Sequence, residues 1–296
     1  MGLEHFYDGA SAFRSHIDLL KGSLPERVIE DSILTVWVGI VQMASCDDKD
    51  KNMRKAATMI SALIDSGAEL ILLPELFNYL PQRIDRERYL ENAEGLDGPT
   101  IFKLSQIAKN RNVSIIAGSI IERCGGEVFN TCCLVTPAGL GGYYRKVHLF
   151  KFGSINEGQV FHPGSGSKVV ECSGMKFGLT ICFDLRFPEL YRQEALAGAD
   201  AITNVAAFLE ETGRTHWMPL LRARAIENQL YIVAANQAKS ELGEPKYYGH
   251  SCIIDPWGRL VARAGLGEEN IVGKIRKERV GEIRRRLPAL SLMGPP

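Results

Sequence analysis

An apolar strand, a helix and a second apolar strand follow one another early in the chain, and this order constrains the fold most strongly. Residues 35–43, TVWVGIVQM, are β-branched and apolar, as in a buried strand. Asp47 or Asp48 can then cap a helix with apolar residues at helical spacing. Residues 69–74, ELILLP, supply the second strand. A strand–helix–strand order predicts a layered α/β fold.

Beyond this unit the pattern mixes crossovers with hairpins. A helix is predicted at 99–112 and one strand at 113–121, and the glycine-containing turn at 122–128 joins that strand to the next. Further strands are expected at 176–182, 200–208, 230–236, 250–255, 259–263 and 270–275, with helices at 185–197 and 214–228. We therefore expect one mixed α/β domain over residues 35–296 and an N-terminal extension over residues 1–34, with a helix at 10–21.

Charge and hydropathy exclude several classes of protein. Lys plus Arg and Asp plus Glu both number 35 among 296 residues, so the balanced charge offers no electrostatic footprint for nucleic acid or an anionic membrane. No apolar run approaches the roughly 20 residues that cross a bilayer. The first residues also lack the basic start and apolar core of a secretory signal. We expect a cytoplasmic protein that binds neither nucleic acid nor membrane.

The cysteines do not form a recognisable framework. There are seven, with no CxxC pair, which argues against a disulfide scaffold or a zinc site. Most are expected to be small buried side chains. No metal is therefore predicted.

Three predicted strand regions carry a reactive residue. Glu75 ends the strand in ILLPELF, Lys146 lies in the short basic strand YYRKVHLF, and Cys182 ends the strand in LTICFDLRF. In layered α/β folds reactive side chains gather where strands end. Taken singly, each residue has an ordinary explanation: a loop charge, an edge-strand charge and a core thiol.

Taken together, the three residues form a set suited to acyl transfer. A cysteine attacks as the thiolate and needs a base to remove its proton. A partly buried glutamate can take that proton, and a fixed lysine can stabilise the oxyanion of a tetrahedral intermediate. Six histidines leave a Cys–His protease site open as well. The sequence by itself does not bring the three residues together in space.

The three motifs LPELF, YRKVHLF and ICFDLRFPEL, in this order, resemble the nitrilase superfamily of carbon–nitrogen hydrolases. The resemblance runs from about Trp37 to Arg286. It implies a catalytic triad of Glu75, Lys146 and Cys182 in a four-layer α-β-β-α sandwich. It also implies a homodimer or higher homo-oligomer that uses no metal or organic cofactor.

The resemblance extends to residues around the triad. The segment NEGQVFHPG resembles the place of a second family glutamate, here Glu157, which helps to position the lysine and the substrate. The backbone N–H of Phe183 would join Lys146 in the oxyanion hole. One departure is Lys151, where many relatives have Asp after HLF, and this puts in doubt how that loop is anchored.

The residues around the cysteine favour one branch of the superfamily. This chain has Phe183 and Asp184 where nitrilases have Trp and Glu after the cysteine. The downstream runs TGRTHWMPLLRARAIENQLYIVAANQ and GHSCIIDPWGR resemble small amidases, namely ω-amidases of 2-oxo dicarboxylic monoamides and deaminated glutathione amidases. The implied reaction is hydrolysis of a small linear carboxamide to carboxylate and ammonia through a thioester. N-carbamoyl amidohydrolases, nitrilases and a non-catalytic binding protein remain alternatives.

Arginine and histidine residues near the cysteine are candidates to bind a substrate carboxylate. Arg186 and His216 are the two we single out, and Arg222 is a third. The competing interpretation pairs Arg186 with Asp184 or Glu189 in a buried ion pair.

Overall fold

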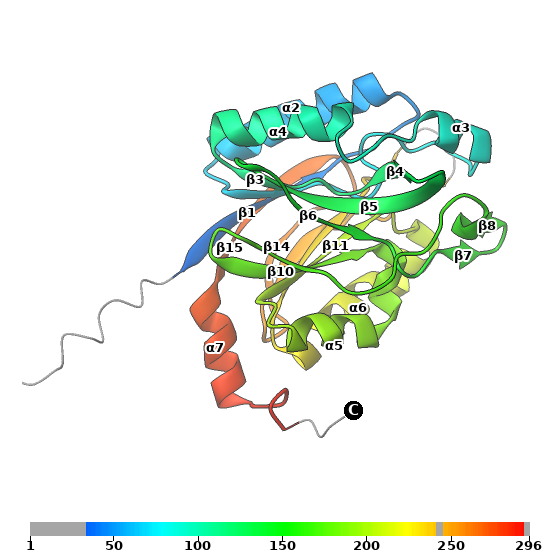
Figure 1. Ribbon diagram of the computed structural model, residues 1–296. Coiled ribbons are helices and arrows are strands. Elements are labelled where there is room, and N and C mark those ends of the chain that lie inside the picture. The colour runs from blue at the N-terminus through cyan, green and yellow to red at the C-terminus, as the bar shows by residue number, and fades with distance from the viewer. Residues whose placement is uncertain (1–33, 241–244, 293–296) are drawn as a thin grey trace, which may run out of the picture. The chain divides into compact units, whose positions relative to one another are not determined.

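The computed structural model describes residues 34–240 and 245–292 (Figure 1). The predicted N-terminal extension and its helix at 10–21 lie, apart from Leu34, outside the described residues. Two large β-sheets form the centre of the described chain, and a two-stranded hairpin of β7 (Lys151–Phe152) and β8 (Ile155–Asn156) lies apart from them.

The first sheet has seven strands in the order β15-β1-β2-β3-β5-β4, with β6 also paired to β5. Its centre, β1-β2-β3, is parallel, and β15 and β5 flank it antiparallel. Its strands are β1 (Thr35–Gln42), β2 (Leu70–Leu72), β3 (Ser114–Ile116), β4 (Ile120–Cys124), β5 (Glu127–Thr136), β6 (Gly139–Arg145) and β15 (Glu269–Arg276).

The second sheet has six strands in the order β14-β13-β12-β11-β10-β9. Strands β10, β11 and β12 are parallel, and the outer strands run antiparallel to their neighbours. Its strands are β9 (Val169–Cys172), β10 (Met175–Ile181), β11 (Ala201–Ala206), β12 (Tyr231–Asn236), β13 (Cys252–Ile254) and β14 (Leu260–Arg263).

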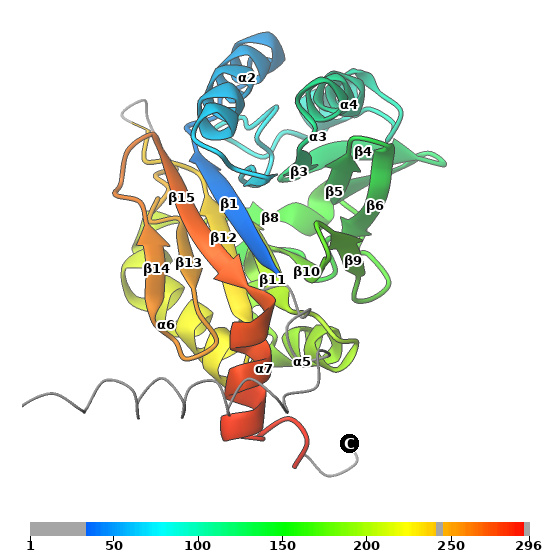
Figure 2. The ribbon, with the colours of Figure 1, turned by 90° about the vertical axis from the view of Figure 1, so that its left-hand side faces the viewer.

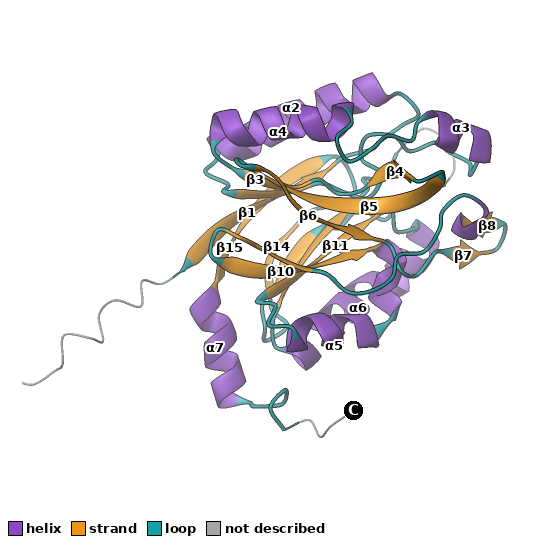
Figure 3. Cartoon of the chain, in the orientation of Figure 1, coloured by secondary structure: helices purple, strands orange, loops and turns teal. Residues whose placement is uncertain are grey.

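Helices cover the outer face of each sheet, so the domain has four layers (Figure 3). Helices α2 (Lys49–Asp65) and α4 (Pro99–Arg111) pack on the first sheet, and α5 (Pro188–Leu196) and α6 (Glu210–Asn228) pack on the second. The inner faces meet where β1 contacts β12 and where β10 contacts β5 and β6 (Figure 2). The predicted α-β-β-α sandwich is confirmed. Two further helices, α3 (Arg86–Glu91) and α7 (Lys277–Arg286), lie at its margins.

Helix α2 shows how the sequence pattern produces the outer layer. Asp48, one of the two predicted caps, accepts a hydrogen bond from the Lys51 N–H at 2.9 Å. Ala56, Ile60 and Leu63, three to four residues apart, are buried against the first sheet in one apolar core.

The strand predicted at 113–121 is wrong as a single element. The structure divides it into β3 and β4 at Gly118, whose φ is +51°. A β-carbon at Gly118 would lie 2.0 Å from the carbonyl oxygen of Pro74, so only glycine fits this close approach. The chain therefore bends around the segment that leads into Glu75.

Two helix predictions also need correction. The helix expected at 185–197 is two pieces: a 3-10 helix, η2 (Cys182–Arg186), and then α5, separated by extended Phe187. Pro188 enforces this break because the residue before a proline is driven out of the helical region. Helix α6 begins at Glu210 rather than at 214. Within the described residues, no helix combines the length and the apolar character needed to cross a membrane.

Candidate active site

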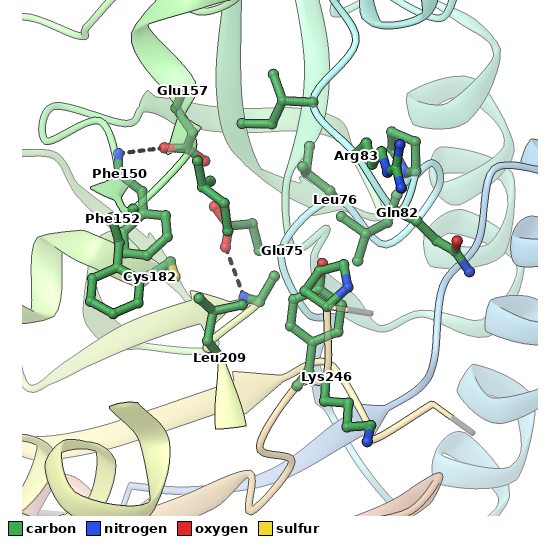
Figure 4. Close-up of a pocket in the computed structure, with 18 of the residues that line it drawn as sticks. Glu75, Leu76, Gln82, Arg83, Phe150, Phe152, Glu157, Cys182, Leu209 and Lys246 are labelled. Carbon is green, nitrogen blue, oxygen red and sulfur yellow. Dashed lines mark hydrogen bonds between the residues drawn. The ribbon is translucent and has the colours of Figure 1, made fainter. Parts of the chain in front are cut away.

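The predicted reactive residues come from both sheets and border one cavity. Glu75 follows β2 and Lys146 follows β6 in the first sheet, whereas Cys182 directly follows β10 in the second. Lys146 is thus one residue beyond its strand rather than inside it. All three residues, together with Glu157, border a cavity of about 1090 Å³ (Figure 4).

Lys146 is a buried cation held between two carboxylates. Its side chain is 1% exposed, and its Nζ lies 2.8 Å from Oε1 of Glu75 and 2.8 Å from Oε2 of Glu157. Burial lowers the pKa of Lys146, but the negative charges of Glu157 and Glu75 outweigh it and raise the pKa well above the usual value. The lysine is therefore a fixed positive charge at neutral pH.

Three donors fix the carboxylate of Glu75. Besides Lys146, the Asn130 Nδ2 donates to Oε1 at 2.8 Å, and the backbone N–H of Ala207 donates to Oε2 at 2.7 Å. Asn130 was not predicted from the sequence. A polar residue inside the apolar run VFNTCC of β5 was the available signal, because a buried amide needs a partner.

Glu157 joins the lysine to the loop that carries β7 and β8. Its Oε2 accepts a hydrogen bond from the Phe150 N–H at 2.7 Å, and its own N–H donates to the Phe150 carbonyl at 2.9 Å. Burial raises the pKa of Glu157, against the opposing charge of Lys146. The loop is thus anchored at Glu157, while Lys151 is exposed at the start of β7. The departure at Lys151 does not disturb the anchor.

Cys182 lies at a tight turn from strand to helix. Its φ is +46°, a left-handed conformation that is uncommon for a non-glycine residue, and the residue is 6% exposed. Phe183 follows in the first turn of η2, where backbone N–H groups have no acceptor within the helix. This position suits the predicted oxyanion-hole donor.

Asp184 braces this turn. It is fully buried and accepts hydrogen bonds from the Ile181 N–H at 3.0 Å and the Tyr144 hydroxyl at 2.8 Å. It also accepts the His148 N–H at 3.0 Å and contacts the His148 Nδ1 at 2.7 Å. Because Tyr144 and His148 flank Lys146 in the chain, Asp184 links the lysine segment to the cysteine turn.

The thiol of Cys182 is neutral at rest. Burial raises its pKa well above the usual value, the charge of Glu75 raises it further, and the charge of Lys146 acts in the opposite direction. Since the thiolate is the nucleophile, attack requires a base that removes the proton. Glu75 borders the same cavity and is the base predicted for that task from the sequence.

Arg186 and His216 occupy different environments. Arg186 borders a second, small cavity together with Cys182 and Thr212, and its Nη1 lies 3.2 Å from Nδ1 of His216. His216 itself is exposed and borders neither cavity, and the same is true of Arg222. Among residues 34–240 and 245–292, Arg186 has no carboxylate within ion-pair distance, so the buried ion pair considered above does not form.

Basic side chains also line the larger cavity. Figure 4 shows Arg83 and Lys246 on its wall, and Arg214 and Lys239 border it as well. Arg214 and Lys239 both contact the carboxylate of Glu210, the latter at 3.1 Å. These four residues come from three separate segments without a shared motif, and for that reason they were not predicted from the sequence.

Comparison with known proteins places this architecture in a family. The family model "Carbon-nitrogen hydrolase" matches residues 37–285. The chain is 35% identical to the ω-amidase NIT2 of Xenopus tropicalis, over 85% of this chain and 92% of that protein. It is 36% identical to the deaminated glutathione amidase of Dictyostelium discoideum, over 76% of this chain and 81% of that protein.

A solved structure agrees with these sequence matches. Nit3 of Saccharomyces cerevisiae, a member of branch 10 of the nitrilase superfamily, superposes with a TM-score of 0.79 and 32% identity, over 86% of this chain and 95% of that one. The extent of these matches leaves one conclusion: the chain belongs to the carbon–nitrogen hydrolase family.

Proposed function

We propose that this amidase-type carbon–nitrogen hydrolase cleaves a small linear carboxamide to carboxylate and ammonia through a thioester on Cys182. One observation carries the proposal. A thiol, a carboxylate and an ammonium from three separate strand ends border one cavity, and the ammonium bridges two buried carboxylates. A nucleophile, a base and a fixed cation are the groups that acyl transfer needs.

Thioester formation begins with proton transfer from the thiol. Two carboxylates share the single ammonium of Lys146, so the buried cluster carries an excess negative charge. Transfer of the Cys182 proton to Glu75 neutralises that carboxylate and moves the negative charge to the sulfur, which becomes the thiolate. The thiolate attacks the amide carbon, and Lys146 with the Phe183 N–H stabilises the oxyanion.

Release of ammonia and hydrolysis complete the cycle. The protonated Glu75 gives its proton to the leaving nitrogen as the C–N bond breaks. Water then enters, Glu75 takes one of its protons, and the resulting hydroxide attacks the thioester carbon. The C–S bond breaks, the carboxylate is released and the proton returns to the sulfur of Cys182.

The substrate class follows from the surroundings of Arg186. Burial lowers the pKa of this arginine, whose guanidinium carbon lies 5.3 Å from the ring centre of Phe208 and 5.7 Å from that of Phe183. A half-buried cation without a carboxylate partner in the described chain, next to the nucleophile, suits a substrate carboxylate. We therefore propose short amides with a distal carboxylate, such as 2-oxosuccinamate-like compounds. The names of the relatives support an amide substrate.

A substrate panel scored by ammonia release tests this proposal. We expect carboxylate-bearing amides to exceed nitriles and N-carbamoyl amino acids in kcat/KM by at least about tenfold, since one contact with a charged group contributes roughly 1.5–3 kcal/mol. Arg186→Lys should raise KM for carboxylate-bearing amides more than for neutral amides. Arg192→Lys, another half-buried arginine outside both cavities, is the control. Equal losses on both amide classes would assign Arg186 to bracing the turn, and faster turnover of N-carbamoyl compounds would overturn the substrate class.

Lys146→Arg separates the geometry of the lysine from its charge. The arginine keeps the charge but replaces a compact ammonium with a wide planar group. We expect kcat to fall by about a hundredfold, because an oxyanion hole tolerates little displacement. Lys49→Arg is the control. The Nζ of Lys49 lies 3.0 Å from Oε1 of Glu94, and neither residue borders the cavity. Near-normal turnover in Lys146→Arg would leave the lysine as a structural charge only.

A further inference from the structure

The two carboxylate oxygens of Glu75 accept different numbers of hydrogen bonds. Oε1 accepts from Asn130 Nδ2 at 2.8 Å and from Lys146 Nζ at 2.8 Å, whereas among the described residues Oε2 accepts only from the Ala207 N–H at 2.7 Å. Each oxygen of an ionised carboxylate has about two acceptor positions. Oε1 is therefore saturated, and Oε2 keeps one free position.

Ala207 also indicates which oxygen lies toward the thiol. Burial and the charge of Glu75 raise the pKa of Cys182, and a hydrogen bond from the Ala207 backbone acts against them and lowers it. Ala207, whose N–H contacts Oε2, also borders both cavities together with Cys182. Figure 4 shows this hydrogen bond of Glu75 as a dashed line and Cys182 among the residues that line the same cavity.

We propose that Asn130 is a positioning residue that, together with Lys146, saturates Oε1 of Glu75 and so directs the proton of Cys182 to Oε2. This inference rests on the proposed role of Glu75 as the base. The S–H bond of Cys182 breaks, an O–H bond forms on Oε2, and the same proton later passes to the leaving nitrogen. Without Asn130, one acceptor position on Oε1 opens and the carboxylate loses a constraint on its rotation.

The burial of Asn130 supports a role beyond packing. Its side chain is fully buried, yet its Oδ1 has no hydrogen-bond partner within the described part of the chain. Within the described chain, this buried amide is held through its Nδ2, which donates to the carboxylate of Glu75 at 2.8 Å. The backbone carbonyl of Asn130 also accepts the Lys146 N–H at 2.9 Å, so one residue fixes both the base and the cation.

Asn228 offers a matched control. It is equally buried, its Oδ1 is likewise unpaired in the described chain, and its Nδ2 donates to the Arg224 carbonyl at 3.0 Å instead of to a catalytic group. A substitution at Asn228 therefore removes the same buried amide without touching Glu75.

The experiment compares Asn130→Ala, Asn130→Asp and Asn228→Ala on one carboxamide. For Asn130→Ala we expect kcat to fall by about ten- to a hundredfold, the range for one lost hydrogen bond to a charged group, with KM changed by less than about threefold. Asn130→Asp keeps the shape but turns a donor into an acceptor beside Glu75, so its loss should be larger. Asn228→Ala should keep kcat within about threefold.

The pH profile supplies a readout that a packing defect would not move. Loss of a donor to the ionised carboxylate should shift the acidic limb of kcat/KM to higher pH in both Asn130 variants and leave it in place in Asn228→Ala. The other titratable groups that face Glu75 are unchanged in every variant; they are Lys146, Glu157, Cys182, Tyr89 and Tyr247.

The outcomes separate this inference from the proposed function. If Asn130→Ala matches Asn228→Ala in kcat and pH profile while Cys182→Ala is inactive, the positioning role of Asn130 is rejected and the triad is retained. If Cys182→Ala keeps its turnover, both the positioning role and the proposed function are rejected. Should Asn130→Ala fail to fold, Asn130→Ser removes the same donor with a smaller change of volume, and wild-type turnover in that variant overturns the inference.

Discussion

Cys182→Ala should lower kcat/KM for the best amide by at least about a thousandfold, because removal of a covalent nucleophile eliminates the thioester route. The thermal midpoint should stay close to that of the wild type, since alanine keeps the same backbone and loses only one buried atom. Ammonia release and thermal unfolding of the purified protein measure the two effects.

The matched control is Cys172→Ala. Cys172 is also a buried thiol, on β9, and it borders neither cavity near the triad. Its substitution should leave turnover within about twofold. Iodoacetamide should alkylate Cys182 in the free protein, and a bound substrate amide should protect Cys182 from this alkylation. Turnover within tenfold of wild type in Cys182→Ala would reject the thioester mechanism and favour the non-catalytic alternative.

Glu75→Gln should produce two opposite changes. Turnover should fall by about a hundred- to ten-thousandfold, the usual contribution of a general acid–base group. Burial and then the charge of Glu75 raise the pKa of Cys182, so removal of that charge should lower the thiol pKa. The rate of alkylation by iodoacetamide should therefore begin to rise at a lower pH in the variant than in the wild type.

A glutamate outside the cavity provides the comparison. Glu94 is buried and ion-paired with Lys49, so Glu94→Gln removes a similar charge without changing the site. It should affect thermal stability but neither turnover nor the pH profile of alkylation. A Glu75→Gln enzyme that turns over normally, or whose alkylation profile moves to higher pH, would contradict the assignment of Glu75 as the base.

The main layers and the reactive residues could be predicted because they leave local signals. A β-branched strand, a capped helix and apolar spacing identify β1 and α2 within a few residues. Glu75 and Cys182 were recognisable as reactive residue types at the ends of apolar strands. The prediction that they lie close to Lys146 rested on the resemblance to a family. The positions of strands along the sequence do not give the distance between residues of different sheets.

Elements with weak periodicity were not predicted. Helix α7, KERVGEIRRR, buries only Val280 and Ile283, and α3 buries only Tyr89. Such short apolar stripes do not stand out from loop sequence. The division of 113–121 depends on the approach of Gly118 to Pro74, a contact between segments more than forty residues apart.

The contacts of Asn130 and Ala207 with Glu75 were not predicted for the same reason. Both are tertiary hydrogen bonds between residues distant in the chain, and one of them uses only a backbone N–H, which carries no side-chain signal. The expectations of a homodimer or larger homo-oligomer, of a cytoplasmic location and of activity without metal or organic cofactor remain predictions.

The origin of the reactive residues in different sheets has a consequence for folding. Glu75 and Lys146 project from one sheet and Cys182 from the other, so neither sheet alone contains the complete site. During refolding, secondary structure can form before the sheets dock, but contacts of such high sequence separation form late and slowly. Recovery of enzymatic activity is therefore a more stringent measure of the native state than recovery of far-ultraviolet circular dichroism. A nascent chain therefore has no hydrolase activity until both sheets have formed and docked.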